Sequence, residues 1–169
     1  MKQPTKVVPP VRLKDFDPDF HAGLDKDATR EQTTKLCQRI GELQELLHAE
    51  ARHALVILLQ GMDCSGKDGA GKRVLEFVSP LGVEAVNFKS PSAEELRHDF
   101  LWRVHKAVPR HGHIGVFNRS HYEDVLIVRV MKLQPERVWR ARYDQINAFE
   151  KHLAENRVHL LKFFLHISR

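Results

Sequence analysis

Apolar residues recur along this chain in short runs that alternate with helical stripes. Residues 54–60 begin with six consecutive apolar side chains, which predicts a strand that is buried on both faces. A second strand is predicted at 82–89, where apolar positions alternate, and a third at 114–117. Residues 158–167 are apolar and β-prone, which predicts a fourth strand near the end of the chain.

Helices are predicted before the first strand and between the strands. Apolar residues at helical spacing indicate helices at 27–53, 71–78 and 122–130, and a longer one after Pro135. A further helix is predicted at 92–108, because Ser92 and Glu95 form a capping box ahead of a continuing apolar face. Alternating strands and helices predict an α/β fold, a three-layer sandwich with a central parallel sheet and helices on both faces.

The chain is expected to form one domain preceded by an arm. Residues 1–25 contain four prolines and little periodicity, which predicts an extended N-terminal arm. Residues 26–169 are then expected to form a single α/β domain, because that length is sufficient for one hydrophobic core.

Charge and cysteine content narrow the class of protein. The net charge of +5 favours an anionic partner, and residues 101–122 contain several basic side chains and no acidic one. Nucleic acid is not favoured, because the aromatic residues near this span fall on predicted core faces. Two cysteines and the absence of a long apolar run predict a cytoplasmic protein with neither a disulfide framework nor a membrane association.

The first strand leads into GMDCSGKDG, residues 61–69, which has the glycine and lysine spacing of a phosphate loop (Walker A). In such a loop, backbone N–H groups and the following helix start bind phosphate oxygens, and a lysine adds a full positive charge. We therefore assign phosphate binding to Gly61, Cys64, Ser65, Gly66, Lys67, Asp68 and Gly69.

Two carboxylates in this segment predict a metal ion. Asp68 stands where a Ser or Thr hydroxyl usually reaches Mg²⁺, and Asp63 lies within the loop itself. Both would repel a polyanion unless a divalent cation such as Mg²⁺ lay between them and the phosphates. The alternative is that residues 63–65 form an ordinary turn and that Asp68 caps the helix.

A polar cluster, residues 118–124, follows the third predicted strand. Ligands of open α/β sheets bind beyond the carboxyl ends of the strands, so this cluster is expected beside the phosphate loop if the two strands are neighbours. Arg119 would bind phosphate there, although an ion pair with Glu123 is the alternative. The assignments are Asp63, Lys67 and Arg119 for catalysis; Lys89, Arg103 and Arg119 for additional phosphate binding; and Asp63, Asp68, Glu123 and Asp124 for metal.

Three ordered segments carry a resemblance to a known family: the loop GMDCSGKDG, FKSPSAEELRHDFLWR at 88–103, and GVFNRSHYEDVLIVRV at 115–130. Over residues 10–169 the chain resembles polyphosphate kinase family 2. The resemblance implies a thymidylate-kinase-like P-loop fold. It also implies Mg²⁺-dependent transfer of the terminal phosphate between inorganic polyphosphate and a nucleoside mono- or diphosphate.

The resemblance also implies roles for particular residues. Asp63 matches the loop acid that binds metal and activates the acceptor phosphate. Lys67 matches the loop lysine, and Arg119 matches the arginine that binds phosphate at the end of the strand. Glu123 and Asp124 match a second acidic motif. The forms GKDG and HDFLWR resemble the branch that accepts AMP as well as ADP. A homodimer or homotetramer is implied too, as is a C-terminal lid, which this chain is expected to lack.

Two other functions fit the residues. One is a non-catalytic polyanion-binding module built on the basic span, and the other is a nucleotide kinase that uses ATP as its donor. A polyphosphate-driven enzyme would form ATP from ADP, an ATP-dependent kinase would consume ATP, and a binding module would do neither.

Overall fold

The computed structural model describes residues 10–20 and 22–167, and a sheet of four strands lies at its centre. The spatial order of the strands is β2-β3-β1-β4, and each neighbouring pair is parallel. In chain order the strands are β1 (Ala54–Gly61), β2 (Val83–Asn87), β3 (Ile114–Asn118) and β4 (Val158–Leu165). The sequence predicted all four.

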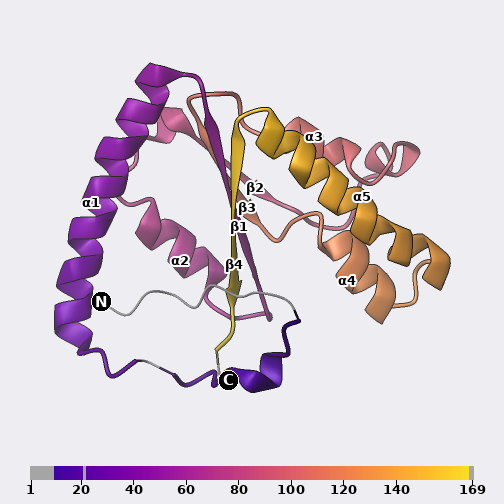
Figure 1. Cartoon of the computed structure of the whole chain (residues 1–169), viewed down its shortest axis with the longest axis horizontal. Helices are drawn as coiled ribbons and strands as arrows, with labels where there is room; N and C mark the ends of the chain where they lie inside the picture. The colour runs from indigo at the N-terminus through magenta and orange to yellow at the C-terminus, as the bar shows by residue number, and fades with distance from the viewer. Residues whose placement is uncertain (1–9, 21, 168–169) are drawn as a thin grey trace.

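Helices cover both faces of the sheet (Figure 1). On one face lie α1 (Lys26–Glu50) and α2 (Lys67–Val74); on the other lie α3 (Trp102–Ala107), α4 (Glu123–Val130) and α5 (Glu136–Glu155). Short 3-10 helices span Leu13–Asp15, Pro80–Gly82 and Glu95–Arg97. The predicted three-layer α/β architecture is therefore confirmed.

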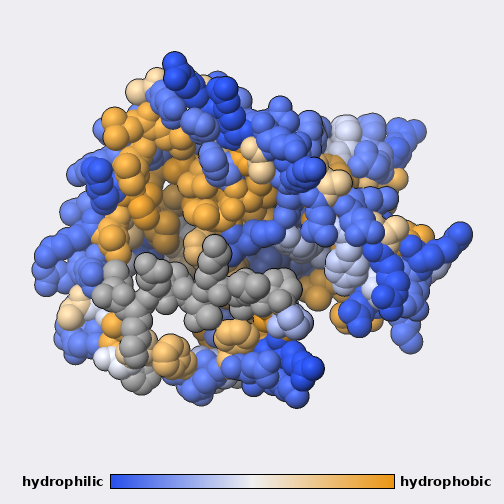
Figure 2. Space-filling view, in the orientation of Figure 1, coloured by the Kyte–Doolittle hydropathy of each residue, from blue (hydrophilic) through white to orange (hydrophobic). Residues whose placement is uncertain are grey.

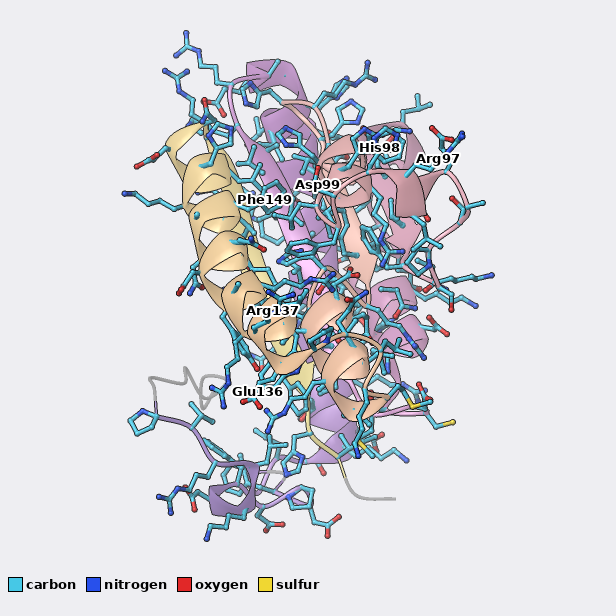
Figure 3. All side chains as sticks on the ribbon, turned by 90° about the vertical axis from the view of Figure 1, so that its right-hand side faces the viewer. Arg97, His98, Asp99, Glu136, Arg137 and Phe149 are labelled. Carbon is cyan, nitrogen blue, oxygen red and sulfur yellow. The ribbon has the colours of Figure 1, made fainter. Side chains whose placement is uncertain are left out.

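Strand β1 is apolar from Ala54 to Leu59 because its two faces enter two different hydrophobic clusters. Val56 and Leu58 pack in the cluster that contains Phe149 of α5, a residue labelled in Figure 3. Leu59 packs in the second cluster, together with Leu47 of α1. A central strand covered on both sides has no solvent face, which is why its sequence does not alternate.

The predicted helix at 92–108 is broken in the middle, so this prediction was wrong in part. The capping box does form, because the Ser92 amide donates to Glu95 Oε2 at 2.7 Å and the Glu95 amide donates to Ser92 Oγ at 3.2 Å. It begins only a short 3-10 helix. The carboxylate of Asp99, labelled in Figure 3, then accepts the Leu101 amide at 3.0 Å. This local hydrogen bond competes with helical ones, and α3 begins after it.

The helix after the phosphate loop also begins earlier than predicted. It was expected at 71–78, whereas α2 starts at Lys67 and ends at Val74. Gly66 caps its N-terminus in the left-handed region, with φ of 82°. The helix therefore begins at the loop itself, and its first amides are available to a ligand held there.

The predicted arm, residues 1–25, falls partly on residues 1–9 and 21, which lie outside the described residues. In the remainder, the 3-10 helix at Leu13–Asp15 has no buried residue. The division into an arm and a core domain stays a prediction. Among the described residues, none of the helices combines the length and apolar character that crossing a membrane requires.

Strand β4 forms one edge of the sheet and carries exposed apolar side chains. Phe163 and Phe164 keep 42% and 51% of their surface exposed. Beside the strand, a cavity of about 440 Å³ is lined by apolar residues of the sheet, α1 and α2. Figure 2 shows the same apolar surface between α1 and the sheet.

The burial of β1 predicts how much stability the protein loses when one of its core side chains is shortened. Leu58 is fully buried, so Leu58→Ala should lower the free energy of unfolding by about 2–5 kcal/mol in urea denaturation. The matched control is Leu46→Ala on α1, where the side chain is 62% exposed and a loss within about 0.5 kcal/mol is expected. Equal losses in the two variants would contradict the position of β1 between two clusters.

Candidate functional site

Two loops meet at the carboxyl edge of the sheet because β1 and β3 are parallel neighbours. Leu59 of β1 lies opposite Asn118 of β3, so the phosphate loop and the turn after β3 leave the sheet at the same level. The Arg119 amide extends this pairing by donating to the carbonyl oxygen of Leu59 at 3.0 Å. The expectation that the two segments are neighbours is confirmed.

The shape of the phosphate loop depends on glycine at position 61. Gly61 has φ of 153°, and an added Cβ would lie 2.6 Å from Ser65 Oγ and 2.8 Å from the carbonyl oxygen of Leu165 in β4. Cys64, an exposed free cysteine, also has a positive φ, of 64°. Left-handed residues in a turn direct successive N–H groups toward one side, which is the geometry of an anion-binding nest.

Lys67 points into the loop rather than into solvent. The residue is 9% exposed. Its Nζ donates to the carbonyl oxygens of Gly61 at 3.0 Å and Met62 at 2.6 Å, and to Ser65 Oγ at 3.3 Å. The ammonium group is therefore held where the loop would receive phosphate oxygens.

Arg119 connects the turn after β3 with the phosphate loop. Its backbone is left-handed, with φ of 59°, and its Nη2 donates to Asp63 Oδ1 at 2.7 Å. The sequence left open an ion pair with Glu123; within the described residues, the ion pair of Arg119 is formed with Asp63. A cation and an exposed carboxylate from two different segments thus meet above the sheet.

Asp68 faces the end of β3. It lies in the first turn of α2, and its carboxylate accepts a hydrogen bond from the side-chain amide of Asn118. We did not assign Asn118 from the sequence, although it directly precedes Arg119. Its position as the last residue of a strand beside the loop was the available signal.

The two acids at the start of α4 point in different directions. Glu123 is half-buried, and burial raises its pKa while the charge of Arg119 acts in the opposite direction. The carboxylate of Asp124 faces the interior, where Oδ2 accepts from Arg103 Nη2 at 3.1 Å. In the described ranges, the predicted metal ligands do not gather into a cluster of three or more that could hold a metal ion.

Arg103 also lies in the interior. It is 9% exposed and, besides pairing with Asp124, its Nη1 donates to the carbonyl oxygen of Lys89 at 2.8 Å. Arg142 of α5 donates to the backbone oxygen of Asp124 at 2.6 Å. These contacts attach the segment after β2 to α4 and α5, with Lys89 contributing its backbone.

A cavity of about 620 Å³ opens beside the phosphate loop, between α2 and strands β2 and β3. Lys67, Asp68, Lys72 and Asn118 supply its polar lining, and the remainder is mainly apolar. A cavity of this size fits a small phosphorylated molecule. Lys67, at the start of α2, is the cation of this lining that belongs to the loop.

The strand, glycine loop and helix in sequence, with Lys67 inside the loop, define a P-loop kinase-like protein. The chain belongs to the polyphosphate kinase 2 family: the model of that family, Polyphosphate kinase 2 (PPK2), matches residues 23–169.

Relatives and a solved structure agree with this assignment. The chain is 49% identical to the AMP/ADP-polyphosphate phosphotransferase of Meiothermus ruber, covering 93% of this chain and 60% of that protein. It is 43% identical to the ADP-polyphosphate phosphotransferase of Rhodopseudomonas palustris, covering 99% of this chain and 58% of the relative. The crystal structure of polyphosphate kinase 2 from Arthrobacter aurescens matches with a TM-score of 0.92 and 39% identity, covering 96% of this chain and 59% of that chain. The chain therefore spans about three fifths of the length of these relatives.

The tight packing at Gly61 gives a prediction with an internal control. Gly61→Ala should lower the free energy of unfolding by about 1–3 kcal/mol, because the added Cβ meets the backbone oxygen of β4. At Gly69 in α2, an added Cβ meets nothing within 4 Å, so Gly69→Ala should be neutral or stabilising by up to about 1 kcal/mol. Urea denaturation of both variants checks this. A loss at Gly69 as large as that at Gly61 would argue against the loop geometry.

Proposed function

We propose that this chain is the core of a Mg²⁺-dependent phosphotransferase. It would move the terminal phosphate between inorganic polyphosphate and a nucleoside mono- or diphosphate. The observation that carries the proposal is the meeting of Lys67, Arg119 and Asp63 at one edge of the sheet, on two segments joined by the pairing of β1 with β3. The printed names of the relatives support the same reaction class.

Two cations would bind the transferred phosphate. In the reaction, a terminal oxygen of the acceptor nucleotide forms a bond to the last phosphorus of the polyphosphate. The bond from that phosphorus to the next bridging oxygen breaks, and the shortened polyphosphate keeps the electron pair. Negative charge is spread over the equatorial oxygens, so positioned cations supply most of the catalysis. Lys67 and Arg119 would exchange their protein partners for these oxygens.

The donor set near the loop fits Mg²⁺. Asp63 and Asp68 offer exposed carboxylate oxygens, and Mg²⁺ prefers one or two carboxylates together with phosphate oxygens and water. When bound, the ion would neutralise phosphate charge beside the loop. Arg119 orients Asp63, and Asn118 orients Asp68. Glu123 adds a half-buried carboxyl nearby, whereas we assign Asp124, with Arg103, to holding α4 in place.

The acceptor is proposed to be AMP as well as ADP. The sequence forms GKDG and HDFLWR resemble the branch with both acceptors, and the Meiothermus ruber relative carries both in its name. A homo-oligomer in the cytoplasm belongs to the same proposal and depends on the family resemblance. A polyanion-binding module remains the second candidate, and the formation of ATP separates it from the enzyme.

The first test is ATP formation by the purified chain supplied with ADP, Mg²⁺ and long-chain polyphosphate. Lys67→Ala should lower the rate by about 10²–10³-fold, because it removes a charge aimed at the transferred phosphate. Lys35→Ala is the matched control, since Lys35 is exposed on α1 and pairs with nearby Glu31. An unchanged rate in Lys67→Ala would overturn the proposed role, and polyphosphate binding without turnover would favour the binding module.

The metal assignment has a separate test. Chelation of divalent ions should abolish ATP formation, and Mg²⁺ should restore it. Asp63→Asn should raise the Mg²⁺ concentration needed for half-maximal rate by about tenfold or more, since an amide is a weaker oxygen ligand than a carboxylate. Glu31→Gln, at an exposed position of α1, should leave this concentration unchanged. A Mg²⁺ dependence that is identical in the wild type and Asp63→Asn would remove Asp63 from the metal site.

A further inference from the structure

A polar cluster that is buried except at Lys162, which is half exposed, adjoins the turn that carries Arg119. Glu150 of α5 is at its centre. Its Oε1 accepts from the Tyr122 hydroxyl at 2.6 Å and from His121 Nε2 at 3.1 Å, and its Oε2 accepts from Lys162 Nζ of β4 at 2.7 Å. Lys162 Nζ also donates to the Tyr122 hydroxyl at 3.1 Å. One carboxylate thus joins the turn, α5 and β4.

The groups of this cluster are strongly coupled. Burial alone would raise the pKa of Glu150, but hydrogen bonds from His121, Lys162 and Tyr122 lower it to about 2. Burial and the neighbouring Glu150 raise the pKa of Tyr122 to about 12. Over the physiological range, Glu150 is therefore an anion that accepts from a neutral hydroxyl and from an ammonium group.

The two ring nitrogens of His121 have different surroundings. The residue is 1% exposed, and in the part of the chain that the structure describes its Nδ1 is buried with no hydrogen-bond partner. A neutral ring with the proton on Nε2 can donate to Glu150 and leaves Nδ1 as a bare acceptor. His121 Nε2 is therefore the ring nitrogen that contacts Glu150.

The turn is also attached on its other side. Ser120 is fully buried, and its Oγ is 2.7 Å from the side-chain amide of Gln60 at the end of β1 and accepts the Tyr122 amide at 3.2 Å. Arg119 lies directly before these anchors, in a left-handed conformation that is unfavourable for a residue with a side chain. Such a conformation persists only where its surroundings determine it, and the residues that follow Arg119 provide those contacts.

We propose that Glu150 is a positioning residue that acts through His121 and Tyr122 to hold the turn so that Arg119 faces the phosphate loop. The inference rests on the proposed function, which gives Arg119 its phosphate. That Glu150 holds the turn is supported separately, by its contacts with His121 and Tyr122. Packing alone would not need an ionised group at this depth. The carboxylate accepts from two donors on the turn and from one on β4, so it restricts how the turn can move relative to the sheet.

The first experiment measures amide hydrogen exchange by NMR on the ligand-free protein. Glu150→Gln keeps the size of the side chain but removes the charge that His121, Tyr122 and Lys162 share. The amide of Arg119, which donates to Leu59, should exchange about tenfold faster relative to the amide of Leu55 in the same strand pairing. Equal exchange at Arg119 in the variant and the wild type would overturn the proposal.

Two further variants make the result specific. Leu153→Ala, at a buried position of α5 outside the cluster, should lower the thermal midpoint without a selective effect on Arg119. Tyr122→Phe removes a single hydroxyl, so it folds more readily than Glu150→Gln and should give a smaller acceleration at Arg119. If Leu153→Ala accelerates Arg119 exchange as much as Glu150→Gln does, the effect is general loosening and the proposal fails.

The second experiment measures binding of tripolyphosphate by calorimetry in a double-mutant cycle. Glu150→Gln should weaken binding about tenfold or less, and it should weaken Arg119→Ala no further, because both changes remove the same contact. Additive losses would overturn the action of Glu150 through Arg119. If Arg119→Ala binds as well as the wild type, the proposed function of Arg119 fails, while the exchange experiment still decides whether Glu150 holds the turn.

Discussion

The parallel pairing of β1 with β3 and β4 is the constraint on which the rest of the structure depends. It places the phosphate loop, the Arg119 turn and the end of β4 at one edge of the sheet. Gly61 lies opposite Leu165 in this register, and the oxygen of Leu165 excludes a side chain at position 61. The glycine of the loop is therefore required by the neighbouring strand as well as by the turn. A change in register would disturb both at once.

The charged residues of this region divide into exposed and buried groups with different physical roles. Asp63 and Asp68 lie at the surface of the loop, where an ion or phosphate can reach them. Asp124 and Glu150 are largely buried, and each contacts a cation, Arg103 or Lys162. Buried ion pairs contribute little net stability because desolvation opposes the attraction between the charges. What they do provide here is a fixed direction for α4 and for the turn before it.

The sequence predicted the strands, the phosphate loop and the position of that loop beside the turn after β3, but it missed individual side-chain contacts. The four strands and the phosphate loop follow from continuous apolar runs and from glycine spacing. The break at Asp99 was missed because a single side-chain hydrogen bond outweighed the periodicity of the segment. The contact between Asp68 and Asn118 joins residues 50 positions apart, and no local pattern indicates it. No pattern in the sequence distinguishes the buried Asp124 from its half-buried neighbour Glu123.

The position of Lys67 has a consequence for how tightly any anion can be held. Its ammonium already has three protein oxygens around it and little contact with water. Stripping water from an ammonium group is a large unfavourable step, and in this protein it accompanies folding rather than ligand capture. Under the proposed function, a phosphate oxygen would replace two backbone carbonyls and one hydroxyl, all of them neutral, around an ammonium group that is already dehydrated. Most of the dehydration cost of Lys67 would therefore be separate from the free energy of binding.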